Sequence, residues 1–233
     1  MPRRRSSLRV TSFRLSIMRR IFITATDTDA GKTYVTASLL RALKTAGRDV
    51  IGLKPIASGS EGAAISPDVA ALLKAQDLAD SAAANINLYS FNAALAPSQA
   101  AAEEGQNIDL QELVKWCEQQ AEGHDISLIE GVGGLMVPLA EDYLVCDWLD
   151  DMPDCEVLLV VRTRLGGINH ALLTLDKLQR MGRSPRWIVL NDADHVGQEM
   201  QAKHKHALEK YGEISVIEHG MESQIGIKTL YID

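Results

Sequence analysis

One stretch near the start of this 233-residue chain, residues 20–33, decides its fold class: it reads RIFITATDTDAGKT. Residues 20–24 (RIFIT) predict a β-strand, and Gly31, Lys32 and Thr33 predict the start of a helix. Gly-Lys-Thr between a strand and a helix is typical of a phosphate-binding loop, because the backbone N–H groups of a helix start attract anions. In such loops the lysine reaches the outer phosphates and the threonine hydroxyl can bind Mg²⁺.

The rest of the chain alternates between short apolar segments and amphipathic ones. Strands are predicted at residues 50–53, 126–130, 157–161, 187–190 and 214–217, and helices at residues 32–46, 67–75, 109–121, 169–181 and 196–211. This alternation predicts one α/β domain, residues 20–233, with a mostly parallel β-sheet that helices flank on both faces. Ligands of such folds bind beyond the carboxyl ends of the strands, so functional residues are expected there.

Composition and charge exclude several classes of protein. With 46% hydrophobic and 24% charged residues, the chain is typical of globular proteins rather than of disordered or collagen-like ones. The first 20 residues hold seven arginines and no acid, which leaves 17 Lys and Arg against 31 Asp and Glu in the remainder. The remainder is therefore too acidic to be a general binder of nucleic acid.

The basic residues at the start belong to a predicted extension, residues 1–19. It has no apolar core, so we interpret it as a disordered tail or the product of an upstream start codon rather than a secretory signal. No stretch reaches the ~18 apolar residues of a membrane span, so no membrane association is expected. Three cysteines without C-x-x-C spacing (Cys117, Cys146 and Cys155) are interpreted as buried thiols of a cytoplasmic protein.

Two charged residues follow the second predicted strand. Lys54 opens Lys-Pro-Ile-Ala-Ser-Gly, where it could neutralise charge on a transferring phosphoryl group or could be a solvated surface residue. Asp68 lies in the first turn of the helix at residues 67–75, which Ser66 is expected to cap and Pro67 to begin. Its carboxylate could hold Mg²⁺ or could only stabilise the helix dipole.

Polar and glycine-rich segments follow the later strands. Glu130 precedes Gly-Val-Gly-Gly, where an acid can bind a metal in phosphoryl-transfer sites and glycines let a ligand approach the backbone. Residues 164–170 (RLGGINH) lead into a helix whose first N–H groups could bind a carboxylate, with Asn169 as its alternative N-cap. Asn191 could read a base edge or cap the next helix.

Together these residues resemble the dethiobiotin synthetase family, whose members have a P-loop NTPase-like fold. The phosphate loop of the family resembles G-T-D-T-x-V-G-K-T, which residues 25–33 match except at two positions. Its K-P-[VI]-x-[ST]-G is matched by residues 54–59, its V-E-G-[AV]-G-G by residues 129–134 and its L-G-x-I-N-H by residues 165–170. Four motifs in order, across residues 21–191, are far more specific than a phosphate loop alone.

The resemblance implies a cyclo-ligase of biotin biosynthesis. This enzyme uses ATP and CO2 to carboxylate 7,8-diaminononanoate and close the ring of dethiobiotin, releasing ADP and phosphate. The resemblance implies catalytic roles for Lys32 and Lys54, and Mg²⁺ binding by Thr33, Asp68 and Glu130. Nucleotide contacts would come from Asp29, Ala30, Gly31, Lys32, Thr33, Tyr34, Glu130, Gly131, Val132, Gly133 and Asn191. Substrate contacts would come from Thr28, Lys54, Ser58, Gly166, Gly167, Ile168 and Asn169. Family members are homodimers, so residues 166–169 would receive the substrate carboxylate across the interface.

Two departures from the family pattern concern the nucleotide. Ala25 and Ala30 replace a glycine and a valine, and the first replacement would be costly if Ala25 needed a positive φ. After Asn191 the family has a proline-containing loop near the base, whereas residues 215–222 contain no proline. We therefore expect weak discrimination among nucleoside triphosphates.

Three alternatives share parts of this pattern. A P-loop ATPase switch of the partitioning or cell-division type would act through protein partners. It typically carries an extra lysine early in the loop, and residues 25–29 contain none. A cobyrinic-acid-type amide synthetase would need a glutaminase domain, for which this sequence is too short. The third alternative is a catalytically inactive relative, which the alanine at position 25 would permit.

Overall fold

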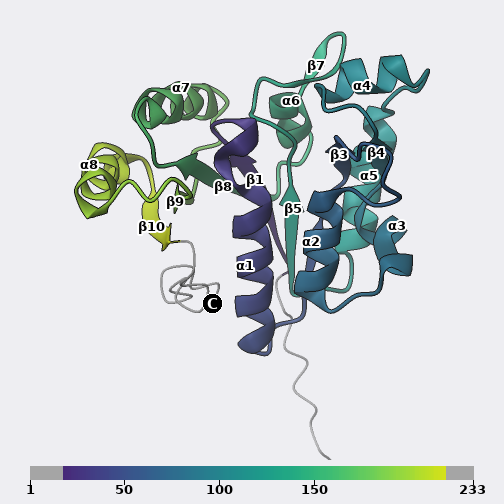
Figure 1. The fold of residues 1–233 in the computed structure, drawn as a ribbon, viewed down its shortest axis with the longest axis horizontal. Coiled ribbons are helices and arrows are strands. Elements are labelled where there is room, and N and C mark those ends of the chain that lie inside the picture. The colour runs from purple at the N-terminus through teal and green to yellow at the C-terminus, as the bar shows by residue number, and fades with distance from the viewer. Residues whose placement is uncertain (1–17, 219–233) are drawn as a thin grey trace, which may run out of the picture.

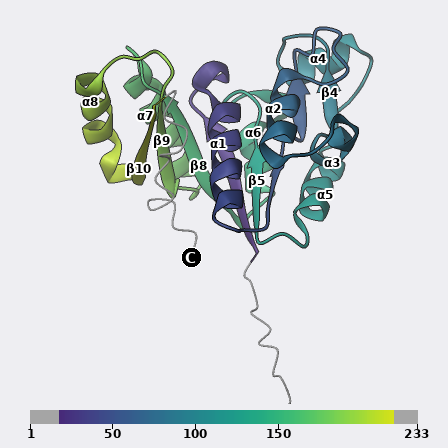
Figure 2. The ribbon, with the colours of Figure 1, turned by 60° about the horizontal axis from the view of Figure 1, so that its bottom comes forward.

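The computed structural model describes residues 18–218, which form a central β-sheet with helices packed on both faces (Figure 1). Figure 2 shows the same layers from another direction, with α1 in front of the middle of the sheet. Most of the predicted basic extension, and residues 219–222 of the segment expected near the base, lie outside the described residues.

The main sheet has six parallel strands in the order β10-β9-β8-β1-β5-β2. Their bounds are β1 Arg19–Ala25, β2 Val50–Leu53, β5 Ile126–Glu130, β8 Cys155–Arg162, β9 Trp187–Asp192 and β10 Glu213–Glu218. In the register, Ile21 of β1 lies between Leu128 of β5 and Glu156 of β8. All six predicted strands are confirmed, and so is the parallel α/β architecture.

Two small sheets and the helices complete the described fold. The small sheets pair β3 (Ile56–Ser58) with β4 (Tyr89–Phe91) and β6 (Pro138–Ala140) with β7 (Tyr143–Leu144). The helices are α1 Lys32–Thr45, α2 Pro67–Gln76, α3 Ala83–Ile86, α4 Pro97–Glu103, α5 Leu110–Ala121, α6 Val145–Asp150, α7 Gly167–Arg180 and α8 Gln198–Leu208. Short 3-10 turns are η1 Thr28–Ala30, η2 Asp80–Ala82 and η3 Glu209–Tyr211.

Two predicted helix boundaries need correction. Helix α7 starts at Gly167, two residues before the predicted start, because Gly166 adopts a left-handed φ of 84° and is the N-cap. Asn169 therefore lies inside the first turn and is not the N-cap. Helix α8 starts two residues later than predicted, and its predicted last turn is the separate 3-10 turn η3.

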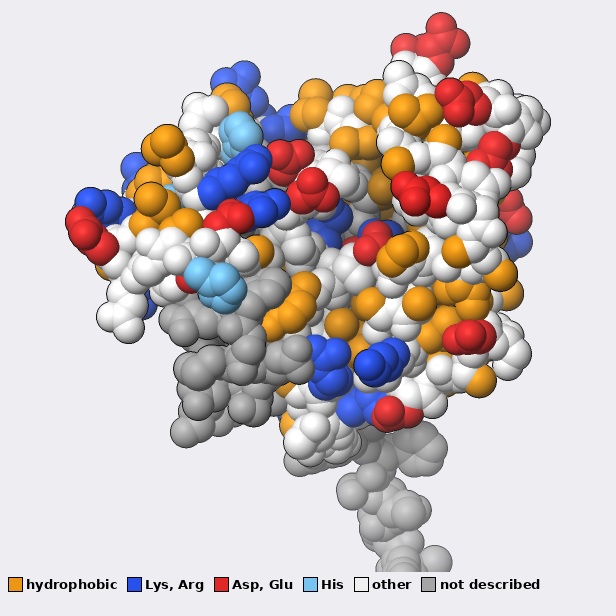
Figure 3. All heavy atoms as spheres, in the orientation of Figure 1, with side chains coloured by type: hydrophobic (Ala, Val, Ile, Leu, Met, Phe, Trp, Pro, Cys, Tyr) orange, Lys and Arg blue, Asp and Glu red, His pale blue; other side chains and the backbone are white. Residues whose placement is uncertain are grey.

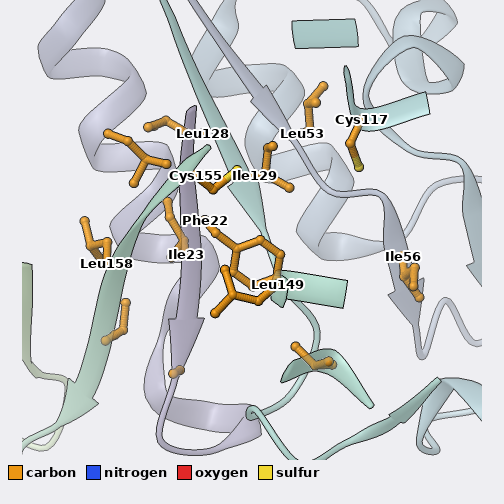
Figure 4. Close-up of a cluster of buried hydrophobic side chains, with 14 of the residues drawn as sticks. Phe22, Ile23, Leu53, Ile56, Cys117, Leu128, Ile129, Leu149, Cys155 and Leu158 are labelled. Carbon is orange, nitrogen blue, oxygen red and sulfur yellow. The ribbon is translucent and has the colours of Figure 1, made fainter. Parts of the chain in front are cut away.

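The core lies where β1, β5 and β8 meet (Figure 4). Phe22 and Ile23 of β1, Leu128 of β5 and Leu158 of β8 are each fully buried. The ring of Phe22 meets that of Trp148 edge to face, with centroids 4.8 Å apart and an interplanar angle of 81°. Burial of such side chains on neighbouring strands is the main stabilising contribution to this sheet.

Strand β8 connects the main cluster to a second one. Leu158 and Val160 belong to the main cluster, whereas Leu159 and Val161 pack with buried side chains of α7 and α8. Alternate residues of a strand face opposite sides of the sheet, so α7 and α8 cover the same face. The carboxyl end of β8 is thereby fixed beside the phosphate loop that follows β1.

Two further sequence expectations concern the described residues. No helix within residues 18–218 combines the length and the apolar character that crossing a bilayer requires. The thiols of Cys117, Cys146 and Cys155 are all buried and free, as predicted. Burial raises the pKa of each, that of Cys155 to about 12.

Candidate active site

The phosphate loop connects the end of β1 to the first turn of α1. Asp27 caps the turn η1, because its carboxylate accepts a hydrogen bond of 2.8 Å from the N–H of Thr28. Gly31 follows with a φ of +88°, and a Cβ at this position would lie 2.0 Å from Asn191 Nδ2. As N-cap of α1, Gly31 has no side chain to bond the first-turn N–H groups, which suits a helix start that binds an anion.

Lys32 joins the phosphate loop to the glycine-rich turn that follows β5. Its side chain is buried, and Nζ donates to the carbonyl oxygens of Gly133 at 2.7 Å, Asp27 at 3.3 Å and Thr28 at 3.4 Å. Burial lowers the pKa of Lys32 to about 8, and the positive charge of Lys54 acts in the same direction. Lys32 is therefore a cation that a polyphosphate would stabilise.

Four side chains from four parts of the chain form one polar cluster. Lys54 Nζ lies 2.6 Å from Glu130 Oε1 and 2.9 Å from Asp68 Oδ2. Thr33 Oγ1 lies 2.7 Å from Glu130 Oε1 and 2.8 Å from Asp68 Oδ1. The structure thus brings together the four residues that sequence analysis took from the phosphate loop, the ends of β2 and β5, and the start of α2.

The charges of this cluster stabilise one another. Burial alone would lower the pKa of Lys54, but the negative charges of Glu130 and Asp68 outweigh it and raise the pKa above its ordinary value. Burial alone would raise the pKa of Asp68, but Lys54 and Thr33 outweigh it and the pKa is lowered. Lys54 is therefore cationic and Asp68 anionic at neutral pH.

Local contacts position Lys54 and Asp68. The N–H of Lys54 donates to Ile86 O at 2.7 Å, and the amide of Asn87 donates to Lys54 O, also at 2.7 Å. The side chain of Gln76, at the end of α2, pairs with both backbone groups of Gly52 in β2. Helix α2, which carries Asp68, is thereby fixed to the strand that precedes Lys54.

Three members of this cluster, Thr33, Lys54 and Asp68, line a cavity of about 670 Å³, whereas Glu130 contacts two of them without lining it. Its polar lining residues are Thr28, Asp29, Lys32, Thr33, Lys54, Ser58 and Asp68. The rest of its lining is mostly small or apolar and includes Ala94, Leu95, Ala96, Pro97 and Val137. In Figure 3, charged side chains of both signs gather around the middle of the molecular face that is turned to the viewer. The cavity can thus hold a ligand that has both charged and hydrocarbon parts.

Two buried oxygens of the site have no hydrogen-bond partner within residues 18–218. They are the hydroxyl of Ser58 and Oε2 of Glu130. A buried polar atom left in this way is costly unless a ligand, ion or water satisfies it. The hydroxyl of Ser58, which lines the cavity, therefore marks a position where a bound molecule would contact the site, and Oε2 of Glu130 is an oxygen that an ion or water would satisfy.

The donor set fits Mg²⁺. Among residues 18–218 no group of three or more His, Cys, Asp or Glu side chains could hold a metal. Thr33, Asp68 and Glu130 offer one hydroxyl and two carboxylates close together. Mg²⁺ prefers such oxygens and usually keeps waters and substrate phosphate oxygens as its other ligands, so a site with few protein ligands suits it.

Other predicted residues lie beside the cavity rather than in its lining. Asn191 is fully buried and donates from Nδ2 to Ala30 O at 2.9 Å, so its amide contacts the phosphate loop. Tyr34 belongs to the first turn of α1, and Gly131 packs closely against Phe22. The expected contact of Asn191 with a base stays a prediction.

The residues predicted to bind the substrate carboxylate are not brought into the cavity of this chain. Gly166 and Asn169 are exposed at the start of α7, with Gly167 buried between them.

Ala25 is buried at the end of β1, and it is not one of the non-glycine residues with positive φ in residues 18–218. The replacement of glycine at this position is therefore mild.

Two parts of the site were not predicted from the sequence. The apolar lining residues 94–97 carry no chemically distinctive side chain, and the proline that opens α4 was their only signal. Arg162 and Arg164 contact the phosphate loop at Asp29 and Asp27, respectively. Their signal was two arginines at the end of the most apolar strand.

The fold, the glycine-capped helix start and the two buried lysines define a nucleotide-binding α/β protein of the P-loop class. A family described as an AAA domain matches residues 19–220. A ParA family ATPase from Chlorobium tepidum has a similar fold, with a TM-score of 0.53, 15% identity and coverage of 88% of this chain and 86% of that one.

Comparison with curated relatives shows to which family within this class the chain belongs. An ATP-dependent dethiobiotin synthetase BioD of Methylobacterium nodulans is 42% identical over 185 residues, which cover 75% of this chain and 81% of that protein. The protein of the same name from Anaeromyxobacter sp. is 41% identical, with coverage of 75% and 77%. BioD 1 of Escherichia coli O157:H7 is 37% identical, with coverage of 77% and 80%. The chain belongs to the dethiobiotin synthetase family.

Proposed function

We propose that the chain is an ATP-dependent dethiobiotin synthase, which carboxylates 7,8-diaminononanoate and closes its ureido ring. The observation that carries this proposal is the position of Lys54. Its buried ammonium contacts Glu130 and Asp68 in the same cavity as Lys32 and Thr33 of the phosphate loop. Two cations in one cavity with a phosphate loop suit a reaction in which phosphoryl and carboxylate charges meet.

The reaction has three steps. One amine adds to CO2 and loses a proton, which gives a carbamate. A carbamate oxygen attacks the γ-phosphorus of ATP, and the bond to ADP breaks. The second amine attacks the carbonyl carbon of this phosphorylated carbamate, loses a proton and displaces phosphate, so the ring closes without any further reactant. Because both amines belong to one molecule, the chain has only to position them and to compensate charge.

Different residues of the chain would have different roles in these steps. Lys32 would hold the outer phosphates, and Lys54 would compensate negative charge on the carbamate and on the transferring phosphoryl group. Thr28 and Ser58 would contact the diamine and the carbamate. Thr33, Asp68 and Glu130 would hold Mg²⁺, which when bound supplies further positive charge at the phosphates. The remaining predicted residues of the phosphate loop and of the turn after Glu130 would surround the nucleotide.

The two ends of the diamine would find different surroundings. The apolar lining residues 94–97 suit the hydrocarbon chain. The substrate carboxylate would bind at residues 166–169 of a second copy, so we propose a homodimer with its site at the interface. The exposed side chains of Leu165 and Leu173 beside this helix start, 92% and 64% exposed, support that arrangement.

Phosphate release measured with Mg-ATP and bicarbonate, with and without 7,8-diaminononanoate, tests the function. We expect release to depend strongly on the diamine, and mass spectrometry to detect the ring-closed product. Slow release that is indifferent to the diamine would contradict the proposal and favour an ATPase switch that acts through protein partners.

A further inference from the structure

Arg162, the last residue of β8, contacts two loops at once. Its Nε and Nη2 donate to the two carboxylate oxygens of Asp194 at 2.7 and 2.6 Å, which is a bidentate pair. Its Nη1 donates to the backbone carbonyl of Asp29 at 3.1 Å. One guanidinium therefore joins the phosphate loop to the connection between β9 and α8.

A second arginine supports the other end of the same turn. Arg164 Nη2 lies 3.1 Å from Asp27 Oδ2, while the other oxygen of Asp27 accepts from the N–H of Thr28. The turn η1 is thus held by one arginine at each end. Arg162 is the last residue of β8, the strand that neighbours β1 in the sheet, and Arg164 follows two residues later.

The turn held in this way belongs to the site. Thr28 and Asp29 line the cavity, and only Ala30 separates them from Gly31 and the helix start that would bind phosphates. Strand β9, which leads into the β9–α8 connection, is also linked to the phosphate loop, because Asn191 donates to Ala30 O. The hydrogen bonds of Arg162 to Asp29 and Asp194 add a second link between the phosphate loop and the residues at and after the end of β9.

We propose that Arg162 is a positioning residue for nucleotide binding, because its tie between Asp29 and Asp194 holds the phosphate loop in its binding shape. This inference rests on the nucleotide-binding part of the proposed function. A preorganised loop binds more tightly because less ordering is needed when the ligand arrives. Lysine cannot take over this role, since only the planar guanidinium makes the bidentate pair and the third bond together.

The test compares full-length Arg162→Gln, Arg162→Lys and Asp194→Asn with the parent chain. The matched control is Arg186→Gln, because Arg186 also makes an ion pair, with Glu156, and stacks on Trp187 outside the cavity. ADP affinity is measured by calorimetry, together with KM for ATP, KM for the diamine and kcat. Circular dichroism and denaturant unfolding show that each variant is folded.

We expect Arg162→Gln and Arg162→Lys to weaken ADP binding and raise KM for ATP by roughly 5- to 20-fold, as loss of charge-assisted bonds predicts. Asp194→Asn should have a smaller effect in the same direction. KM for the diamine and kcat should change by less than about 2-fold, and Arg186→Gln should bind ADP like the parent.

Two results would overturn the inference. If Arg162→Lys binds ADP like the parent while Arg162→Gln does not, the positive charge matters and the bonding geometry does not. If all Arg162 and Asp194 variants bind ADP like the control, no positioning role exists. A parent chain that binds no ADP would overturn the proposed function as well, which separates the two failures.

Discussion

The ammonium of Lys54 lies 2.6 Å from Glu130 Oε1, with the two side chains only 3% and 0% exposed. A buried ion pair gains little net stability, because removing two charges from water costs about as much as their attraction returns. The second oxygen of Glu130 has no hydrogen-bond partner within the described residues. A buried ion pair that adds little to the stability of the fold and leaves one carboxylate oxygen without a partner is typical of a functional site.

Replacing Lys54 by Ala should reduce turnover far more than nucleotide binding. The charge of Lys54 is needed mainly in the transition state, so we expect kcat to fall about 10²- to 10³-fold while ADP affinity changes by less than about 5-fold. Steady-state kinetics and calorimetry measure the two effects. Lys44→Ala is the control, because Lys44 pairs with exposed Asp77 outside the cavity. Equal losses of binding and turnover would contradict this role.

Glu130→Gln should increase the Mg²⁺ requirement. The change keeps the size of the side chain but removes one of the two carboxylates close to Thr33. We expect the Mg²⁺ concentration at half-maximal activity to rise by about 10-fold or more, because Mg²⁺ prefers charged oxygens. A Mg²⁺ titration that matches the parent would remove Glu130 from the metal site.

Binding of metal-free ADP should weaken as pH rises through about 8. Burial and Lys54 lower the pKa of Lys32 to about 8 in the free chain, while Glu130, Asp68 and Asp27 act in the opposite direction. Above that pH the free chain loses the cation, so binding must recover a proton before the phosphates gain a positive partner. Calorimetry in buffers of different ionisation enthalpy should therefore detect proton uptake on binding near pH 8.5.

Lys32→Arg is the control for this pH dependence. Arginine stays charged throughout this range, so its ADP affinity should be weaker but flat between about pH 7 and about pH 9.5. A parent chain with equally flat affinity would show that Lys32 keeps its proton in the free protein.

The same lowered pKa of Lys32 makes the folded state bind fewer protons than the unfolded state above pH 8. Lys32 therefore contributes stability that rises with pH between about 8 and 10.5.

The polar half of the site could be predicted because parallel strands end at one edge of a sheet. Lys54 follows β2, Glu130 ends β5 and Asp68 lies in the first turn of α2, so topology brings them near the phosphate loop. Residues 94–97 could not be predicted, because small apolar side chains acquire their place only when α4 packs on β3 and β6. The tie made by Arg162 depends on β8 lying next to β1, a neighbour order that the alternation of elements does not reveal.

Gly31 and Gly47 allow the cost of backbone strain to be distinguished from the cost of a steric clash, because both have a positive φ but only Gly31 has a close neighbour at the Cβ position. Gly31 has a φ of +88°, and a Cβ would lie 2.0 Å from Asn191 Nδ2, whereas Gly47 has a φ of +76° and an unobstructed Cβ position. Gly47→Ala should lower the free energy of unfolding by about 1 kcal/mol and leave ADP affinity unchanged. Gly31→Ala should lower it further and abolish ADP binding, because Asn191 must move. Equal effects in denaturant unfolding and ADP calorimetry would refute a special role for Gly31.

The position of Asn191 makes strict recognition of adenine difficult. A paired reading of a base edge needs both the oxygen and the nitrogen of an amide, and Nδ2 of this buried residue donates to Ala30 O at 2.9 Å. The sequence also has no proline in residues 215–222, where the family has a proline-containing loop. We therefore expect ATP, GTP and CTP to support turnover with kcat/KM values within about 10-fold of one another. Competition between pairs of nucleoside triphosphates, with diamine-dependent product as the readout, measures this ratio. A preference for ATP of about 100-fold or more would contradict the expectation and require a base contact outside residues 18–218.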